Sequence, residues 1–228
     1  MSAIKTVIFD LDGTLLNTLE DLADSTNHAL ACFGFPPRTL DEVRRFVGNG
    51  VRKLVERALP DGTDSGRFEA VFDCFKRYYV DHCMVKTGLY PGIAELLEAL
   101  KAGGYRTAIV SNKLQGGVDE LYRRYFADTV QVAVGERPDV PCKPAPDMVE
   151  TALRELGATK AGAVYVGDSD VDVATAAAAG LPCISVLWGF RDRDFLLRHG
   201  ATCLAETPAD IWRLLQGGGI GCGQSSKE

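Results

Sequence analysis

The stretch KTVIFDLDGTLLNT, residues 5–18, contains a short apolar run that ends in two aspartates. Val7, Ile8 and Phe9 have the β-branched and aromatic side chains typical of a buried strand, and Asp10 and Asp12 follow it at once. Two carboxylates held this close repel each other, and burial disfavours their ionised forms. We therefore expect a positive charge to lie between them.

The bulk composition restricts the class of protein. Of the 228 residues, 46% are hydrophobic and 25% are charged, as in soluble globular proteins. The net charge of −6, without any basic run, argues against a nucleic-acid partner. No stretch approaches the roughly 20 apolar residues of a membrane span, and Asp10 and Asp12 interrupt any signal-peptide core. We expect a cytoplasmic protein without membrane partners, either a monomer or a homodimer.

The cysteines and histidines give no metal or disulfide pattern by their spacing. The seven cysteines are odd in number and never form a C-x-x-C pair, so we expect neither a disulfide framework nor a structural zinc site, and we interpret them as buried or idle thiols. His28, His82 and His199 lie in helical patterns, and we identify no acidic or cysteine partner at ligand spacing. We assign them no role.

From Gly88 onward, apolar runs of strand length alternate with helical patterns. With the first strand at 4–9, the expected strands are 106–112, 129–135, 162–168 and 181–189. The expected helices are 92–102, 114–125, 146–156, 170–179 and 207–215. This alternation predicts βαβ units and a mainly parallel sheet. The expected fold class is therefore α/β, a doubly wound, Rossmann-like core with at least five strands.

Residues 17–85 interrupt this alternation with an all-helical block. A helical pattern begins near Asn17, and further helices are expected at 39–46, 50–58 and 66–83 without a strand between them. We therefore predict a helical cap domain, residues 17–85, inserted into an α/β core domain of residues 1–16 and 86–216. The Gly-rich tail, residues 217–228, is expected to be disordered. Because the insert leaves the core directly after Asp12, we expect it to hinge over the site as a lid.

Four polar clusters follow or adjoin the predicted strands. They are Asp10 and Asp12, then Ser111 and Asn112, then Lys143, and last Asp168, Asp170 and Asp172. In an open α/β sheet such residues converge beyond the carboxyl ends of the strands.

The chemistry of these clusters is coherent. Asp10, Asp168 and the backbone carbonyl of Asp12 are hard oxygen donors that suit Mg²⁺, which is the positive charge expected above. Lys143 and the Ser111 hydroxyl suit the oxygens of a phosphoryl group. One aspartate is then free to act as a nucleophile and the other as a general acid and base. We interpret Asp170 as a cap of the helix that follows it.

DLDGTL (10–15), SN (111–112), KP (143–144) and GDSDVD (167–172) resemble the four ordered motifs of the haloacid dehalogenase (HAD) superfamily. The helical insert resembles the cap of those phosphatases of the superfamily that are typified by phosphoglycolate phosphatase. The resemblance implies Asp10 as nucleophile and Asp12 as general acid and base. Lys143 would be catalytic and, with Ser111 and Asn112, would bind phosphate. The implied Mg²⁺ residues are Asp10, Asp12 and Asp168. Asp172 would act on the ion through a water molecule or through a residue that binds it. The dehalogenases lack the second aspartate, so Asp12 favours phosphoryl transfer.

The cap segment FVGNGVRKLVERAL, residues 46–59, contains the residues predicted to recognise the substrate. Its Gly48, Asn49 and Gly50 resemble the cap loop of phosphoglycolate phosphatases, and we expect their backbone N–H groups, with Arg52 or Lys53, to bind a substrate carboxylate. The alternative is that this loop is a plain helix–turn–helix packing element. Trp188 and Phe190 are expected either at the entrance of the site or in the core.

The main interpretation is a Mg²⁺-dependent phosphatase, a phosphoric monoester hydrolase that forms an aspartyl-phosphate intermediate on a small phosphorylated metabolite. The first expected substrate is 2-phosphoglycolate. A phosphotransferring mutase of the same superfamily is the alternative, and pyrophosphate, sugar phosphates and nucleotides remain open as substrates. A non-catalytic binding protein has no need of both Asp10 and Asp12, so this third interpretation is disfavoured.

Overall fold

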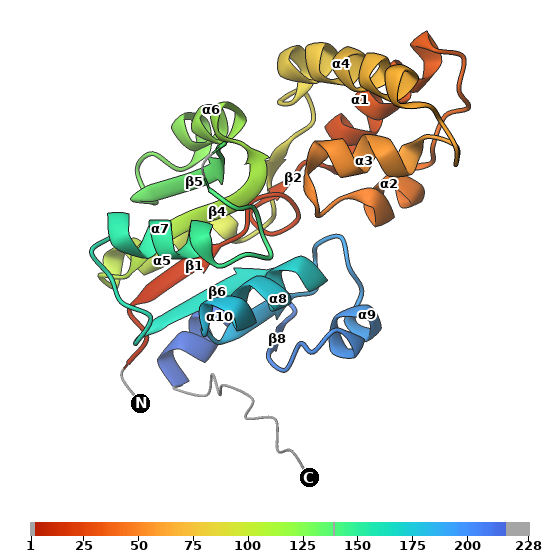
Figure 1. Cartoon of the computed structure of the whole chain (residues 1–228). Coiled ribbons are helices and arrows are strands. Elements are labelled where there is room, and N and C mark those ends of the chain that lie inside the picture. The colour runs from red at the N-terminus through yellow and green to blue at the C-terminus, as the bar shows by residue number, and fades with distance from the viewer. Residues whose placement is uncertain (1–2, 139, 218–228) are drawn as a thin grey trace. The chain divides into compact units, whose positions relative to one another are not determined.

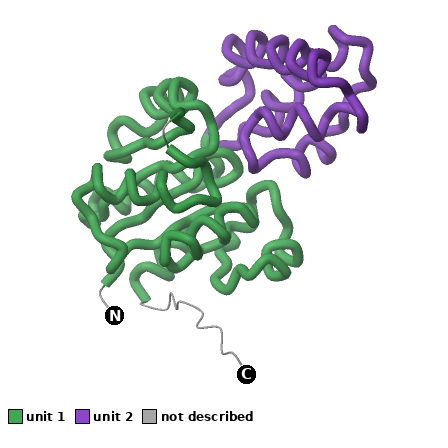
Figure 2. Tube along the Cα trace, viewed as in Figure 1, with its two compact units in different colours: residues 1–15, 89–228 green, residues 16–88 purple. Residues whose placement is uncertain are grey.

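The computed structural model describes residues 3–138 and 140–217, which divide into two compact units (Figure 2). Unit 1 comprises residues 1–15 and 89–228, and unit 2 comprises residues 16–88. The tail predicted to be disordered lies outside the described residues, apart from Gly217. None of the helices in the described part of the chain combines the length and apolarity that crossing a bilayer requires.

Unit 1 is built on a parallel sheet (Figure 1). Its strands stand in the order β5–β4–β1–β6–β7–β8, and every pairing in this sheet is parallel. Their bounds are β1 Thr6–Phe9, β4 Arg106–Leu114, β5 Val132–Glu136, β6 Ala163–Gly167, β7 Cys183–Val186 and β8 Leu204–Ala205. The predicted doubly wound α/β fold is confirmed. Two short strands, β2 (Leu16–Asn17) and β3 (Gly88–Leu89), pair with each other outside this sheet.

Helices cover both faces of the sheet, which explains the apolar strands. On one face α7 (Asp147–Glu155) and α8 (Asp170–Ala179) bury a core that includes Ile8 and Val110. Helices α5 (Ile93–Ala102) and α10 (Pro208–Gly217) pack together on the other. A strand buried on both sides has no polar alternation. The unit is completed by α6 (Gln115–Tyr125) and α9 (Arg193–Arg198).

The strand order places the ends of β1 and β6 beside each other. The chain passes from β1 through β4 to β5 on one side, and then from β6 through β7 to β8 on the other. Ligands of open α/β sheets bind where the order reverses in this way. The backbone N–H of Asp10 donates to the carbonyl of Val166 at 2.8 Å, which fixes the first residue after β1 against β6.

Unit 2 is a bundle of helices, α1 (Leu19–Cys32), α2 (Leu40–Phe46), α3 (Gly50–Ala58) and α4 (Ser65–His82). Local sequence signals start two of them. Thr39 forms a reciprocal capping box with Glu42 at the start of α2, and Asp64 accepts from the backbone N–H of Arg67 at the start of α4. Apolar side chains of α1 and α4, among them Leu30 and Phe75, are buried.

A buried carboxylate ties the start of α1 to the last residues of unit 2. The side chain of Asp21 is in a residue only 2% exposed, and it accepts hydrogen bonds from the backbone N–H groups of Lys86 at 3.0 Å and Thr87 at 2.9 Å. Lys86 and Thr87 lie in neither a helix nor a strand, so no regular backbone acceptor is available to their N–H groups. The Asp21 carboxylate supplies the acceptor instead.

We predict that Asp21→Ala lowers the free energy of unfolding of unit 2 by about 2–4 kcal/mol, because two backbone donors lose a charged acceptor in a buried place. Amide hydrogen exchange of α1 and α4 measures this. Asp24→Ala on the same helix is the control, because it removes only an exposed ion pair with Lys86 and should cost less than about 1 kcal/mol. Equal losses of protection in the two variants would contradict the role of Asp21.

Candidate functional site

The ammonium group of Lys143 is the centre of the site. Its side chain is 2% exposed, and Nζ lies 2.8 Å from Oδ1 of Asp10 and 2.8 Å from Oδ1 of Asp172. It also lies 3.2 Å from the hydroxyl of Tyr165. Burial alone would lower the pKa of Lys143, but the two carboxylates outweigh it and hold the pKa well above its ordinary value. Lys143 is therefore a fixed positive charge inside the site.

Asp10 lies directly after β1 and faces this charge. The residue is 8% exposed, and its Oδ1 also accepts from the backbone N–H of Leu11 at 2.7 Å. Burial raises the pKa of Asp10, the nearby Asp172 raises it further, and Lys143 opposes them. One oxygen of this buried carboxylate is therefore held in place by Lys143 and by the backbone N–H of Leu11.

Asp172 anchors Lys143 from the first turn of α8. The residue is fully buried, its Oδ1 accepts from Lys143 and from the Tyr165 hydroxyl, and its Oδ2 accepts from the backbone N–H and hydroxyl of Ser169. Both oxygens are therefore occupied by protein donors. Ser169 is the N-cap of α8 and forms a capping box with Asp172, so the expectation that Asp170 caps this helix is wrong.

Asp168 follows β6 and is held by two donors. Its Oδ1 accepts from the hydroxyl of Thr14 at 3.1 Å, and its Oδ2 accepts from the backbone N–H of Phe190 at 2.7 Å. Burial, together with Asp172, raises the pKa of Asp168 from 3.8 to about 7. Gly13 permits this approach, because its φ is +86° and a Cβ there would lie 2.5 Å from Oδ2 of Asp168.

Asp12 has a lysine of its own, which the sequence reasoning did not identify. Nζ of Lys113 lies 3.1 Å and 3.3 Å from the two carboxylate oxygens of Asp12. The Lys113 side chain is 5% exposed, whereas that of Asp12 is 17% exposed. The available signal was position, because Lys113 directly follows Ser111 and Asn112 in β4.

Ser111 and Asn112 lie at the carboxyl end of β4, and the structure gives them different surroundings. The Ser111 hydroxyl is buried and accepts from the backbone N–H of Lys113 at 3.2 Å. The side-chain amide of Asn112 donates to the carbonyl of Lys143 at 3.1 Å and accepts from its N–H at 2.8 Å. The Asn112 side chain therefore positions the Lys143 loop, and the phosphate contact expected for Asn112 stays a prediction.

The charges of this cluster do not balance. Four carboxylates, Asp10, Asp12, Asp168 and Asp172, stand against two lysines, Lys113 and Lys143, which leaves −2 when all are ionised. One oxygen from each of Asp10, Asp168 and Asp172 lies within 4.8 Å of the others. The donors are all hard oxygens. The residues therefore fit a divalent cation of the magnesium type, held by Asp10 and Asp168.

The cap residues predicted to read substrate belong to unit 2. Gly48 and Gly50 have φ of +122° and +81°, and the Asn49 side chain accepts from Arg57 at 2.8 Å. The guanidinium of Arg52 forms an ion pair with Glu69 and lies over the ring of Phe68 at 4.8 Å. Arg52 thus has a protein carboxylate as its partner within the unit. A substrate carboxylate would compete with Glu69 for it.

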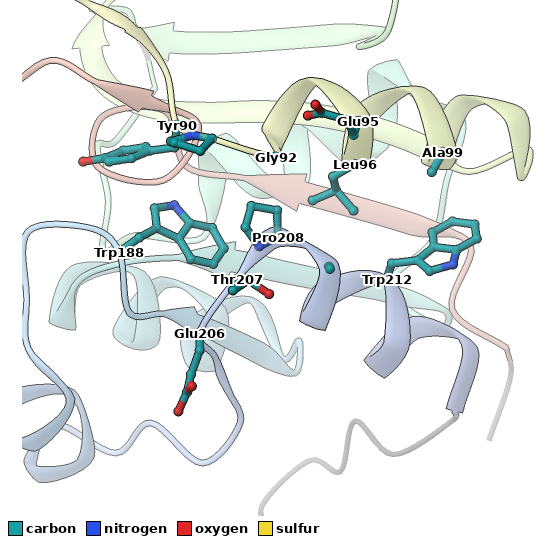
Figure 3. Close-up of a pocket in the computed structure, with 12 residues that line it drawn as sticks. Tyr90, Gly92, Glu95, Leu96, Ala99, Trp188, Glu206, Thr207, Pro208 and Trp212 are labelled. Atoms are coloured by element: carbon teal, nitrogen blue, oxygen red, sulfur yellow. The ribbon is translucent and has the colours of Figure 1, made fainter.

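Trp188 and Phe190 have separate environments. The Phe190 residue is buried, and its backbone N–H holds Asp168. Trp188 donates from Nε1 to the carbonyl of Thr14 at 2.9 Å and lines an apolar groove of about 540 Å³ (Figure 3). The start of α5 and the start of α10 form the rest of this groove, with Trp212 at its far end. None of the four carboxylates lines it.

Comparisons with known proteins agree with this arrangement. The family model described as haloacid dehalogenase-like hydrolase matches residues 7–186. The phosphoglycolate phosphatase of Rhodospirillum rubrum is 36% identical over 215 residues, covering 91% of this chain and 89% of that protein. Phosphoglycolate phosphatase 1 of Pseudomonas aeruginosa is 34% identical over 215 residues, covering 90% and 74%.

A solved structure supports the same assignment. A crystal structure from Lactobacillus delbrueckii subsp. bulgaricus superposes with a TM-score of 0.90 at 33% identity and covers 94% of this chain and 99% of its own. The match of the family model spans the segments that carry Asp10, Ser111, Lys143 and Asp168. The chain therefore belongs to the haloacid dehalogenase-like hydrolases.

Proposed function

We propose that the chain is a Mg²⁺-dependent phosphatase that hydrolyses a small phosphomonoester, with 2-phosphoglycolate as its first candidate substrate. The observation that carries the proposal is the buried Lys143, held between Asp10 and Asp172 with Asp168 alongside. The names of the Rhodospirillum and Pseudomonas relatives support the choice of substrate. We place the enzyme in the cytoplasm with this metabolite as its partner, and its assembly as monomer or homodimer stays a prediction.

Asp10 is the proposed nucleophile. A carboxylate oxygen of Asp10 forms a bond to phosphorus while the ester P–O bond breaks, which gives an aspartyl phosphate and an alkoxide leaving group. Asp12 gives its proton to that leaving oxygen. It then takes a proton from the water that attacks the aspartyl phosphate and releases inorganic phosphate. The two aspartates stand two residues apart and carry different partners, Lys143 and Lys113, which supports different roles for them.

Lys143 and Ser111 are proposed to bind the phosphoryl oxygens. The Lys143 charge neutralises oxygens on which negative charge is spread in the transition state. The Ser111 residue is buried toward the end of β4, and its hydroxyl can donate its hydrogen, because the hydrogen bond from the Lys113 N–H uses the oxygen only as an acceptor.

Asp10, Asp168 and the backbone carbonyl of Asp12 are the proposed holders of Mg²⁺. When bound, the ion would supply positive charge to the phosphoryl oxygens and neutralise the carboxylate excess. Asp172 has both oxygens in hydrogen bonds to Lys143, Tyr165 and Ser169, so we propose that it acts by holding Lys143. Thr14 and the Phe190 N–H orient Asp168, as outer partners commonly orient metal ligands.

The helical unit is proposed to act as a cap that selects the substrate. It contributes none of the carboxylates or lysines of the site, so the chemistry belongs to unit 1. Within unit 2, the Gly48–Gly50 loop and Arg52 remain the proposed reader of a substrate carboxylate.

Activity against a panel of phosphate esters tests the function. The purified chain should release phosphate from 2-phosphoglycolate with Mg²⁺, lose this activity in EDTA, and regain it when Mg²⁺ is restored. Sugar phosphates, nucleotides and pyrophosphate belong in the same panel. Transfer of the phosphoryl group to a second sugar phosphate, without release of phosphate, would replace the phosphatase with the mutase. Full activity in EDTA would contradict the metal site.

We predict that Asp10→Asn removes turnover while the fold is kept. An amide is too weak a nucleophile to attack phosphorus, and a loss of at least ~1000-fold in kcat is expected. Circular dichroism controls for folding. Asp170→Asn is a matched substitution at a half-buried aspartate whose carboxylate lies 3.7 Å from Nε of Arg191, and it should keep most of the activity. More than a few per cent of residual turnover in Asp10→Asn would contradict the role of Asp10 as the nucleophile.

We predict that the metal-free protein loses stability as the pH rises from about 5 to about 7. Folded Asp168 keeps its proton up to a pKa of about 7, whereas the unfolded chain releases it near 3.8. The native state therefore binds more protons in this window, and the free energy of unfolding falls with rising pH, by on the order of 1–4 kcal/mol.

Urea unfolding in EDTA, followed by the fluorescence of Trp188 and Trp212, measures this effect in unit 1. Asp168→Asn is the control, because it removes the titrating group. The difference in free energy of unfolding between the two proteins therefore reports on Asp168 and excludes the contribution of the histidines, which both proteins share. Addition of Mg²⁺ should flatten the slope of the parent protein. A stability difference that does not change with pH would show that Asp168 is ionised throughout.

We predict that Arg52→Ala lowers kcat/KM for 2-phosphoglycolate by ~10- to 1000-fold, the range for losing an ionic contact. Hydrolysis of p-nitrophenyl phosphate, which lacks the carboxylate, should change little. Glu69→Gln is the control, since it leaves the guanidinium but removes its partner in the structure. If Glu69→Gln lowers activity on both esters as strongly as Arg52→Ala does, the ion pair is structural and the carboxylate reader is another group.

A further inference from the structure

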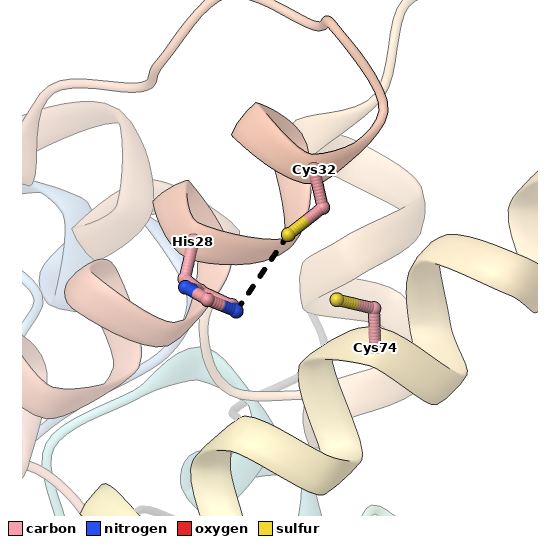
Figure 4. A group of neighbouring side chains, drawn as sticks. All are labelled: His28, Cys32 and Cys74. Carbon is pink, nitrogen blue, oxygen red and sulfur yellow. Dashed lines mark hydrogen bonds between the residues drawn. The ribbon is translucent and has the colours of Figure 1, made fainter.

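A second group of metal-ligating side chains lies within unit 2, between α1 and α4 (Figure 4). His28 and Cys32 stand one turn apart on α1, and Cys74 faces them from α4. The imidazole nitrogen of His28 and the two sulfurs all lie within 4.8 Å of one another. Nε2 of His28 is 3.6 Å from Sγ of Cys32.

This group corrects the sequence analysis, which found no cysteine partner for His28 at ligand spacing. His28 and Cys32 are four residues apart, and that spacing places two ligands on one side of a helix. C-x-x-C spacing does not include a histidine and a cysteine four residues apart, so it did not indicate the pair of His28 and Cys32. Cys74 could not be predicted from local sequence spacing, because only the packing of α1 against α4 brings it close to His28 and Cys32.

We propose that His28, Cys32 and Cys74 form a binding site for Zn²⁺, with the fourth position of the ion open to solvent. One imidazole and two thiolates are borderline-soft donors, which suit zinc and contrast with the hard oxygens of the carboxylate cluster. Zn–S bonds of about 2.3 Å and Zn–N bonds of about 2.0 Å give a tetrahedron edge of about 3.6 Å between N and S. The distance between His28 and Cys32 matches this edge.

The imidazole is already oriented for such a role. The ring of His28 stacks on Tyr78, with centroids 3.9 Å apart and planes at 16°, and Tyr78 in turn stacks on His82 at 3.8 Å. The stack fixes the plane of the His28 ring, and Nε2 then points at Cys32. His28 and Cys32 are exposed, so an ion can reach them without opening the bundle.

Binding would exchange protons for the ion. Burial and the neighbouring Cys32 raise the pKa of Cys74, so this thiol is protonated in the ion-free chain, although Arg77 opposes them. Zn²⁺ would displace one proton from each of the two thiols and leave a site of zero net charge, with two Zn–S bonds and one Zn–N bond. The bound ion would join α1 to α4, and both helices should then resist unfolding.

Titration of the reduced, full-length protein with Co²⁺, followed by displacement with Zn²⁺, tests the site. Tetrahedral cobalt bound by thiolates gives strong visible bands and a thiolate-to-cobalt charge-transfer band, and a carboxylate site gives neither. The charge-transfer band should saturate at one thiolate-bound ion per chain. Cys32→Ser, Cys74→Ser and His28→Gln should each weaken binding by ~100-fold or more, since even outer-shell changes cost 10–100-fold.

Cys203→Ser is the matched control, because this half-buried cysteine lies in unit 1 away from the group, and it should bind as the parent does. Asp168→Asn should also keep the cobalt bands, which separates this site from the proposed Mg²⁺ site. Zn²⁺ should protect amides of α1 and α4 from hydrogen exchange in the parent and fail to do so in Cys74→Ser. Absence of the charge-transfer band, or equal binding by Cys74→Ser and Cys203→Ser, would overturn the proposal. So would a reduced protein that binds no ion but readily forms a Cys32–Cys74 disulfide on oxidation.

Discussion

The buried ammonium of Lys143 is the interaction on which the site depends. Removing a lysine from water costs several kcal/mol, and only close carboxylates compensate for it. Those carboxylates are Asp10, after β1, and Asp172, in the first turn of α8. Asn112 holds the Lys143 backbone from the end of β4. The loss of Lys143 would leave Asp10 and Asp172 buried and close together without the positive charge between them, at a cost of about 3–5 kcal/mol. The side chains of Lys143 and Asn112 therefore join the end of β1, the first turn of α8 and the end of β4.

The two aspartates of the first motif, Asp10 and Asp12, have different surroundings. Asp10 is buried against Lys143, whereas Asp12 is more exposed and paired with Lys113. Carboxylates in different environments can serve different roles in one reaction, one as a nucleophile and the other as an acid and base. Because two lysines cannot neutralise four carboxylates, the cluster favours a divalent cation. The proposed Mg²⁺ would offset this excess of negative charge.

The sequence predicted the elements of the fold well where the physics is local. Both faces of the sheet are covered, so strands such as β1 and β6 are continuous apolar runs that stand out from their surroundings. Strands β2, β3 and β8 have two residues each, too few to show any periodicity. The Ser169 cap was misread as Asp170, since both residue types suit that position and only the hydrogen bond distinguishes them.

The pairings within the site were beyond local reasoning. The Asp12–Lys113 ion pair joins residues 101 positions apart, and the Lys143–Asp172 pair joins residues 29 apart. A lysine in a sequence carries no mark that it is buried, because burial is decided by what packs around it. The motifs located the ends of the strands, and the strand order then decided which side chains meet there.

The division into two units has a physical consequence for the cap. The carboxylates and lysines of the site lie in unit 1, so unit 2 can change its loop residues without altering them. Its own integrity depends on different contacts, namely Asp21 at the start of α1 and the packing of α1 on α4. A metal ion at His28, Cys32 and Cys74 would act on that packing alone. It would stiffen the unit that is proposed to select substrate and leave the carboxylates and Lys143 as they are. Substrate selection and catalysis would then respond to different metals, because the cluster in unit 2 has borderline-soft ligands and the carboxylate cluster in unit 1 has hard ligands.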